Sequence, residues 1–207
     1  MQKLLIATRN GGKIREINQE LMDLPFEVIG LGQAGVPKEF EVEEPAMTME
    51  GNAIIKAMTY GCKTGLLTLA DDAGLETDAL NGRPGVLSAR YAPGTDEDRY
   101  RKLLDELKNT PDDHRGAQFR CVIALYDPTT EKIRTCEGTY RGMIIREPRG
   151  TNGFGFDPIF LNLEKNKTNA EMTLEEKNAV SHRGTALRKA KEILKETFAT
   201  QNKKGVT

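Results

Sequence analysis

The sequence of 207 residues contains no tryptophan, two histidines and three cysteines. With 6% aromatic residues, it offers no evident stacking platform for single-stranded nucleic acid. Cys62, Cys121 and Cys136 stand far apart and form no C-x-x-C pair, which fits reduced cytosolic thiols better than a disulfide framework. With only His114 and His182 available, a zinc site of the His/Cys kind is not expected. Any metal should therefore be held by carboxylates, which favours magnesium.

An excess of one charge sign and long apolar runs are also missing. Lys and Arg number 30 and Asp and Glu 31, which gives a net charge of −1 and a pI near 6.2. A general binder of nucleic acid or membrane surfaces would carry a basic excess, so neither partner is expected, and an anionic ligand would need locally concentrated positive charge. The N-terminus lacks the apolar core of a signal peptide and no run reaches membrane-spanning length, which predicts a cytoplasmic protein.

The apolar periodicity predicts strands that alternate with helices early in the chain and pair as hairpins later. An apolar content of 38% at this length suits a single domain, which can have two lobes. The expected strands cover 3–8, 26–31, 66–70, 119–126, 132–137 and 142–146, and the expected helices begin near 14, 48, 100, 173 and 181. This order argues for a mixed sheet in an α/β protein, with a frayed tail from about 200 to 207.

A glycine-rich turn follows the first predicted strand, with the sequence Thr8-Arg9-Asn10-Gly11-Gly12-Lys13. Such a turn before a helix presents backbone N–H groups and the positive end of the helix dipole to an anion, and Lys13 adds a full charge. The pattern is neither a Walker A loop nor G-x-G-x-x-G. Taken alone, it fits an ordinary strand-to-helix turn with a solvated lysine even better than an anion site.

Two acidic segments are candidates for metal binding and proton transfer. Asp71 and Asp72 come at the predicted end of an apolar strand, where carboxylates suit a hard metal ion and a general base. Strand alternation would turn only one of them into a site. A turn with an Asx hydrogen bond explains the pair equally well. The acidic run 41–44 could add a metal ligand, although by itself it is more typical of a solvated loop.

Two segments near the C-terminus could bind a flat ligand. In Gly153-Phe154-Gly155-Phe156-Asp157-Pro158, the glycines allow close backbone approach while a ring packs on a ligand face. A tight loop whose phenylalanines fill the core explains the pattern equally well. Ser181-His182-Arg183 begins the last predicted helix shortly after Lys177, and His182 should be neutral there because a helix N-terminus disfavours a cation. By itself this segment is more typical of a helix cap.

Each signal alone is weak, but their order along the chain resembles the inosine triphosphate pyrophosphatase family, the non-canonical purine NTP pyrophosphatases. The resemblance runs from about Lys3 to about Ala190. The motifs that carry it are, in order, Thr8-x-Asn10-x-x-Lys13, Glu43-Glu44, Ala70-Asp71-Asp72-x-Gly74-Leu75, Gly82-x-Pro84-Gly85 with Ser88-Ala89-Arg90-Tyr91, Gly153-Phe154-Gly155-Phe156-Asp157-Pro158, and Glu176-Lys177-Asn178 with Ser181-His182-Arg183.

The resemblance implies an elongated mixed sheet flanked by helices, two lobes with the active-site cleft between them, and a homodimer. It implies hydrolysis of ITP, dITP and XTP to the monophosphate and pyrophosphate, with Mg²⁺ bound in each subunit. It makes Asp72 the general base and a metal ligand, and Glu43 a second metal ligand. The substrate-binding residues that it implies are Thr8, Arg9, Asn10, Gly11, Gly12, Lys13, Ala73, Phe154, Gly155, Phe156, Asp157, Lys177, His182 and Arg183.

The sequence departs from the family pattern at several positions. Ala73 stands where serine is common, which removes a side-chain hydrogen bond, and Gly51 stands where glutamate is usual. Glu44 is followed by Pro45-Ala46 in place of the common Thr-Gly, which leaves open whether Glu43 or Glu44 faces the metal. None of these departures removes a residue assigned to catalysis.

Two other functions compete with the leading hypothesis. One is a related pyrophosphatase for pyrimidine or modified nucleotides, which substrate profiling would distinguish. The other is a non-catalytic nucleotide- or RNA-binding module, against which intact Asp72, Lys13 and Lys177 and the balanced charge argue. For a purine substrate, donors at the 6-position would favour a 6-oxo group over the amino group of adenine, which would leave buried donors unpaired.

Overall fold

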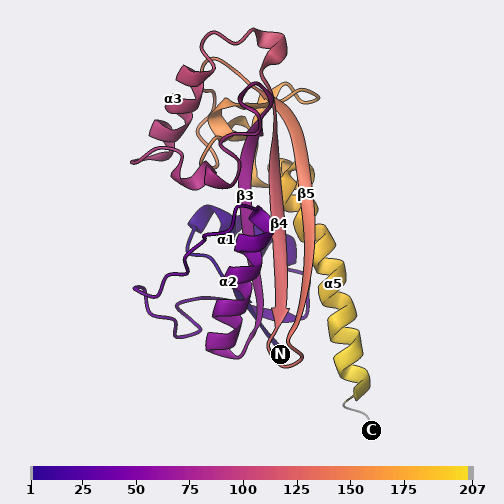
Figure 1. Cartoon of the computed structure of the whole chain (residues 1–207). Coiled ribbons are helices and arrows are strands. Elements are labelled where there is room, and N and C mark those ends of the chain that lie inside the picture. Colours follow the sequence, from indigo (N-terminus) through magenta and orange to yellow (C-terminus); the bar gives the residue numbers. More distant parts are fainter. Residues whose placement is uncertain (1, 205–207) are drawn as a thin grey trace. The chain divides into compact units, whose positions relative to one another are not determined.

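A computed structural model describes residues 2–204 of the chain and places the side chains of residues 2–196. Its strands form a seven-stranded sheet in the order β2-β1-β3-β4-β5-β6-β7, with the long strands β3, β4 and β5 in its middle (Figure 1). The strands are β1 (Gln2–Ile6), β2 (Phe26–Gly30), β3 (Leu67–Thr77), β4 (Gly116–Asp127), β5 (Lys132–Ile144), β6 (Phe160–Asn162) and β7 (Lys167–Thr168). The helices are α1 (Gly11–Leu21), α2 (Met49–Thr64), α3 (Asp96–Glu106), α4 (Leu174–Val180) and α5 (His182–Lys204).

The sheet is mixed, which confirms the predicted fold class. β1 runs parallel to β2 and to β3, whereas β6 is antiparallel to both β5 and β7. The chain divides into two compact units. Unit 1 comprises residues 1–72, 122–137 and 184–207, and unit 2 comprises residues 73–121 and 138–183.

In unit 1, local sequence signals set where the helices begin and end. The Asn10 side chain caps the first turn of α1, and Thr48 caps α2 by accepting from the N–H of Gly51. Gly65 ends α2 at φ +70°, a left-handed conformation that glycine adopts without strain. α2 approaches β4 closely at Gly61, where an added Cβ would overlap the Tyr126 ring.

Unit 2 has its own hydrophobic core, to which β3, β4, β5 and α3 contribute apolar side chains. Phe119 and Phe160 pack with their ring centroids 4.7 Å apart, and both are buried. α3 begins with a capping box in which Thr95 and Asp98 exchange hydrogen bonds. Leu103 of α3 is fully buried in this core.

Several predicted boundaries differ from the structure, among them the start of α3, which is at Asp96 rather than near 100. β3 does not end at the two aspartates but continues to Thr77, because their carboxylates find lysine partners and can therefore stay in a buried strand. The two strands expected over 132–137 and 142–146 are one continuous strand, β5. α5 continues to Lys204, beyond the expected start of fraying at 200, and residues 205–207 lie outside the described part of the chain.

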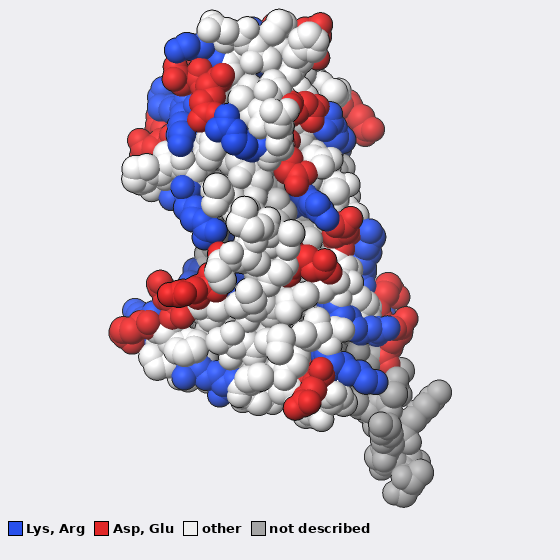
Figure 2. Space-filling view, viewed as in Figure 1, with Lys and Arg blue, Asp and Glu red and all other residues white. Residues whose placement is uncertain are grey.

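The distribution of surface charge agrees with the near-zero net charge of the sequence, and the state of the cysteines agrees with the expectation of reduced thiols. Figure 2 shows acidic and basic side chains interspersed over this face of the molecule. Cys62, Cys121 and Cys136 are all free thiols. Among the residues that the structure describes, no helix is both long and apolar enough to cross a membrane.

Candidate functional site

The predicted anion-binding turn of unit 1 is held closed by Asn10. Its side-chain oxygen accepts hydrogen bonds from the N–H groups of Gly12 (2.8 Å) and Lys13 (3.1 Å). Its own N–H donates to Thr8 Oγ1 at 3.2 Å. Asn10 therefore shapes the turn as the helix cap. The Arg9 guanidinium donates to the carbonyl of Pro37 at 2.6 Å, so the Arg9 side chain contacts the loop that contains Pro37.

Lys13, the last residue of this turn, pairs with one of the two aspartates. Its ammonium lies 3.1 Å from a carboxylate oxygen of Asp71, whose side chain is fully buried. The Lys13 side chain remains 16% exposed, so a ligand can reach the charge that Asp71 holds in place. An ion pair with a buried carboxylate fixes a lysine far better than solvent does, because the alternative is an uncompensated buried charge.

The other aspartate, Asp72, meets a lysine that the sequence analysis did not single out. Lys56 of α2 lies 2.9 Å from Glu44 and 3.7 Å from Asp72, and only 10% of its side chain is exposed. Asn52, one helical turn earlier, donates to Asp72 at 3.3 Å and accepts from the N–H of Ala46 at 2.9 Å. Both residues could have been found in the sequence, because they are polar positions beside the apolar stripe of a predicted helix.

These five charged residues of unit 1 form what we call the acid–lysine cluster: Lys13, Glu44, Lys56, Asp71 and Asp72. Burial raises the pKa of Asp72 above its ordinary value, an effect that the two lysines oppose and the two other carboxylates strengthen. Burial alone would lower the pKa of Lys56, but the three carboxylates outweigh it and raise that pKa. Three carboxylates against two ammonium groups leave the cluster with an excess of negative charge, which suits a bound cation.

The donor set of the cluster fits a magnesium ion that the substrate helps to bind. Within the described residues, no group of three His, Cys, Asp or Glu side chains converges as a complete metal site. Mg²⁺ in phosphate-transferring proteins commonly takes only one or two carboxylates and completes its shell with phosphates and water. Glu44 and Asp72 share Lys56 as a partner and can supply such a pair, whereas Glu43 is exposed. The geometry thus favours Glu44 over Glu43.

In unit 2, the loop 153–157 folds around the carboxylate of Asp157. This carboxylate accepts from the N–H of Phe154 (2.9 Å), from Lys177 (2.6 Å) and from Asn169 (3.1 Å). Gly153 adopts φ +77°, and any Cβ there would overlap the Asp157 carboxylate. The loop therefore needs glycine at this position for both its backbone angle and its space.

The two phenylalanines of this loop have different environments. Phe156 is buried in the core of unit 2, which agrees with the alternative that it fills core. Phe154 is only half-buried, and two cations lie near its ring: Lys177 at 4.8 Å and Arg183 at 5.7 Å from the centroid. Cations at these distances favour one ring orientation. Phe154 is therefore the ring of the loop that remains accessible to a flat ligand.

Three predicted substrate-binding residues of unit 2 are buried. Lys177, His182 and Arg183 are each 2–3% exposed. The His182 ring stacks on Phe119 with centroids 4.6 Å apart and planes 10° from parallel. The structure thus places Lys177 and Arg183 against the loop 153–157, and His182 against Phe119. Ala73, which follows Asp72 in β3, is half-buried.

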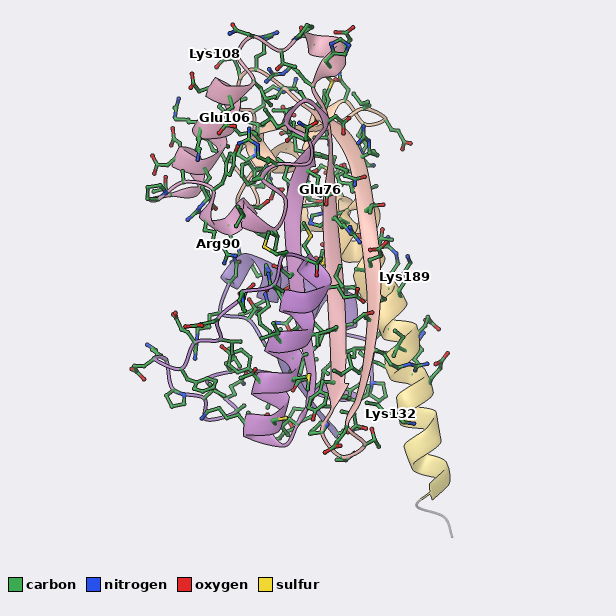
Figure 3. All side chains as sticks on the ribbon, in the orientation of Figure 1. Glu76, Arg90, Glu106, Lys108, Lys132 and Lys189 are labelled. Atoms are coloured by element: carbon green, nitrogen blue, oxygen red, sulfur yellow. The ribbon has the colours of Figure 1, made fainter. Side chains whose placement is uncertain are left out.

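Other polar groups of unit 2 have structural partners. The Tyr91 hydroxyl donates to Glu106, the last residue of α3, at 2.8 Å, and burial raises the pKa of Tyr91 to about 12. Ser88 accepts the N–H of Leu75 at 2.8 Å. Figure 3 labels Glu106, and also Arg90, which precedes Tyr91 in the sequence. His114, expected on the surface, is exposed.

The fold and the two groups of residues define an α/β protein with a mixed sheet, a capped glycine-rich turn and a buried acid–lysine cluster. Residues 4–193 match the Ham1 family, and the chain belongs to this family. It is 47% identical to the dITP/XTP pyrophosphatase of Desulforamulus reducens, over 96% of this chain and 98% of that protein. It is 50% identical to the dITP/XTP pyrophosphatase of Geobacter sulfurreducens, over 94% of this chain and 97% of that protein.

Solved structures agree with these relatives. A HAM1 protein from Coxiella burnetii superposes with a TM-score of 0.85 at 43% identity, over 95% of this chain and 100% of that one. The Ham1 protein of Staphylococcus aureus gives a TM-score of 0.83 at 38% identity, over the same shares of the two chains. The predicted family is thereby confirmed.

Proposed function

We propose that the chain is a nucleoside-triphosphate pyrophosphatase that hydrolyses dITP, ITP and XTP or dXTP to the monophosphate and pyrophosphate. The observation that carries this proposal is the acid–lysine cluster beside the capped turn of α1. A buried group of carboxylates and ammonium groups at a helix N-terminus provides both the positive charge that binds phosphates and a base that activates water. The names of the curated relatives agree with this substrate class.

The triphosphate is assigned to residues of unit 1. Lys13 and the N-terminus of α1 provide positive charge for the phosphates, and Lys56 adds a second ammonium group. Asp71 holds Lys13 in position by the 3.1 Å ion pair, so the charge is already in place before the phosphates arrive. Preorganised charge of this kind lowers the barrier to attack on an anionic phosphate, because little reorganisation is needed during the reaction.

Asp72 is assigned the general base. Its pKa is raised by burial, which makes it a stronger base toward water than an exposed aspartate. Asn52 fixes one of its oxygens by donating at 3.3 Å. We assign the binding of Mg²⁺ to Glu44 and Asp72 rather than to Glu43, because Glu44 shares Lys56 with Asp72 whereas Glu43 is exposed. When bound, the ion would neutralise phosphate charge and stabilise the leaving pyrophosphate.

The purine base is assigned to residues of unit 2. The Phe154 ring offers a face for stacking, and Lys177 and Arg183 lie next to it. His182 is stacked on Phe119 and buried, so it can only adopt a limited range of ring orientations. Donors held in this way favour a 6-oxo purine, since the amino group of adenine would leave them without an acceptor.

The proposal is tested by assaying turnover of ITP, XTP, dITP and ATP with Mg²⁺ and analysing the products. The expected result is rapid conversion of the first three to monophosphate and pyrophosphate, with slow turnover of ATP. Release of inorganic phosphate and a diphosphate would contradict the proposed bond cleavage. A preference for pyrimidine or modified nucleotides would contradict the substrate class.

We also propose a homodimer, on the family resemblance alone, which light scattering would test. The cytoplasmic location stays a prediction.

A further inference from the structure

A second carboxylate outside the loop 153–157 holds its backbone. The N–H of Gly155 donates to Asp96 Oδ2 at 2.7 Å. Asp96 is the first residue of α3, 59 positions earlier in the chain. The two halves of the loop are thus fixed from different places: Asp157 holds the Phe154 N–H from within, and Asp96 holds the Gly155 N–H from α3.

The Asp96 carboxylate is itself fixed in direction. Its other oxygen pairs with the guanidinium of Arg99, one turn further along α3. Arg99 also donates to the carbonyl of Gly94 at 3.0 Å, just before the helix. Arg99 therefore holds the Asp96 carboxylate at the start of α3 through Oδ1, and Oδ2 accepts the N–H of the loop. The helix ends at Glu106, which Figure 3 labels.

The backbone conformation of Gly155 favours glycine at this position. Its φ of +63° lies in the left-handed region, and an added Cβ would meet nothing within 4 Å. A side chain would therefore have room at this position. Glycine is favoured instead by the left-handed backbone angle with which its N–H reaches Asp96. The residue on one side of it is the accessible Phe154, and on the other side is the buried Phe156.

We propose that Asp96 is a positioning residue for base recognition: its carboxylate sets the orientation of the loop 153–157 and thereby of the Phe154 ring. The inference rests on the proposed function of this loop. An ordinary role for an acid in the first turn of α3 would be to offset the helix dipole. Asp98 already provides such a role, since it accepts from the N–H and the hydroxyl of Thr95 at 2.7 Å each.

Asp98 is therefore the matched control. It lies in the same turn, carries the same charge and exchanges hydrogen bonds with Thr95 rather than with the loop. Asp96→Ala should lower the preference for ITP over ATP by roughly 5- to 10-fold, the scale of a charge-assisted hydrogen bond whose acceptor is partly solvated. The loss should appear mainly as a higher KM for ITP. Asp98→Ala should lower Tm by weakening the cap and leave the preference unchanged.

The absence of tryptophan from the chain offers a second, direct measurement. Phe154→Trp introduces a single fluorophore into the loop. In this background, Asp96→Ala should make the indole more accessible to acrylamide quenching, whereas Asp98→Ala should not. Asp96→Asn should give an intermediate result in both measurements, because an amide oxygen still accepts from the Gly155 N–H without the charge. This variant also keeps the test valid if Asp96→Ala folds poorly.

The outcomes separate this inference from the proposed function. Equal effects of the Asp96 and Asp98 substitutions on preference and quenching would overturn the positioning role and leave the loop's function standing. If Phe154→Ala also left the preference for ITP unchanged, the loop would not read the base. In that case the proposed recognition of the purine would itself be wrong.

Discussion

Asp72→Asn tests catalysis and electrostatics with the change of a single atom. The substitution removes the base but keeps the shape of the side chain, and its amide oxygen can still accept from Asn52. We expect kcat for ITP to fall by roughly 10²-fold or more, the scale for loss of a general base. Because the change is nearly isosteric, the variant should fold.

The same substitution should stabilise the metal-free protein at neutral pH. Burial raises the pKa of Asp72 in the folded state, so the folded protein holds this proton more tightly than the unfolded chain does. The ionised carboxylate therefore costs free energy of folding, about 1.4 kcal/mol for each unit by which the pKa is raised. This cost is absent below the unfolded value of 3.8 and appears as the pH rises through the raised folded pKa. Asparagine avoids the cost at every pH.

The assay is a pair of thermal melts in the presence of a metal chelator, one at pH 7 and one near pH 4. Kinetics are measured separately on the same preparations, with Mg²⁺ and without the chelator. We expect a higher Tm for Asp72→Asn than for the unsubstituted protein at pH 7, and a smaller difference at the lower pH. A lower Tm at pH 7 would show that attraction to Lys56 outweighs burial and would refute the electrostatic reasoning. Near-normal turnover would show that another carboxylate, such as Asp71, acts as the base.

Three further substitutions, with Glu43→Gln as a control for the third, test the assignment of roles. Lys13→Ala should lower kcat/KM for ITP and ATP in equal proportion, because both carry the same triphosphate. It should also lower Tm, because the buried Asp71 carboxylate loses its ion pair with Lys13. Unequal losses for the two substrates would contradict the phosphate role. Lys177→Ala should shrink the preference for ITP over ATP by roughly 1–3 kcal/mol, measured as the ratio of kcat/KM values, whereas a proportional loss for both substrates would argue against base reading. Glu44→Gln should weaken Mg²⁺ binding about 10-fold by calorimetry in the presence of a non-hydrolysable triphosphate, and Glu43→Gln should not; the reverse order would restore Glu43 as the ligand.

The local structure and the family are evident from the residue pattern alone. The turn before α1, the start of α2 at Thr48 and the capping box of Thr173 and Glu176 all occur where the residue pattern predicts them. These features depend on hydrogen bonds between residues two to four positions apart, which a sequence displays directly. The dispersed motifs likewise sufficed to indicate the family, because their order is specific even though each motif is short.

Which charges meet in unit 1 depends on how distant segments of the chain pack. The sequence shows neither that Lys13 pairs with Asp71 nor that Lys56 lies between Glu44 and Asp72, since these partners are separated by 12 to 58 positions and meet only when the helices pack on the sheet. The residue pattern also predicts that the strand ends at the aspartates, because an acid in a buried strand is costly unless it is paired, and the sequence does not show the partner.

The same limit applies to the loop 153–157 in unit 2. Its sequence contains two phenylalanines between glycines, and no periodicity tells which ring enters the core. The structure buries Phe156 and leaves Phe154 accessible because the Asp157 carboxylate, held by Lys177 and Asn169, fixes the backbone that carries both rings. The orientation of a short loop is set by such long-range partners, and a linear sequence does not specify them.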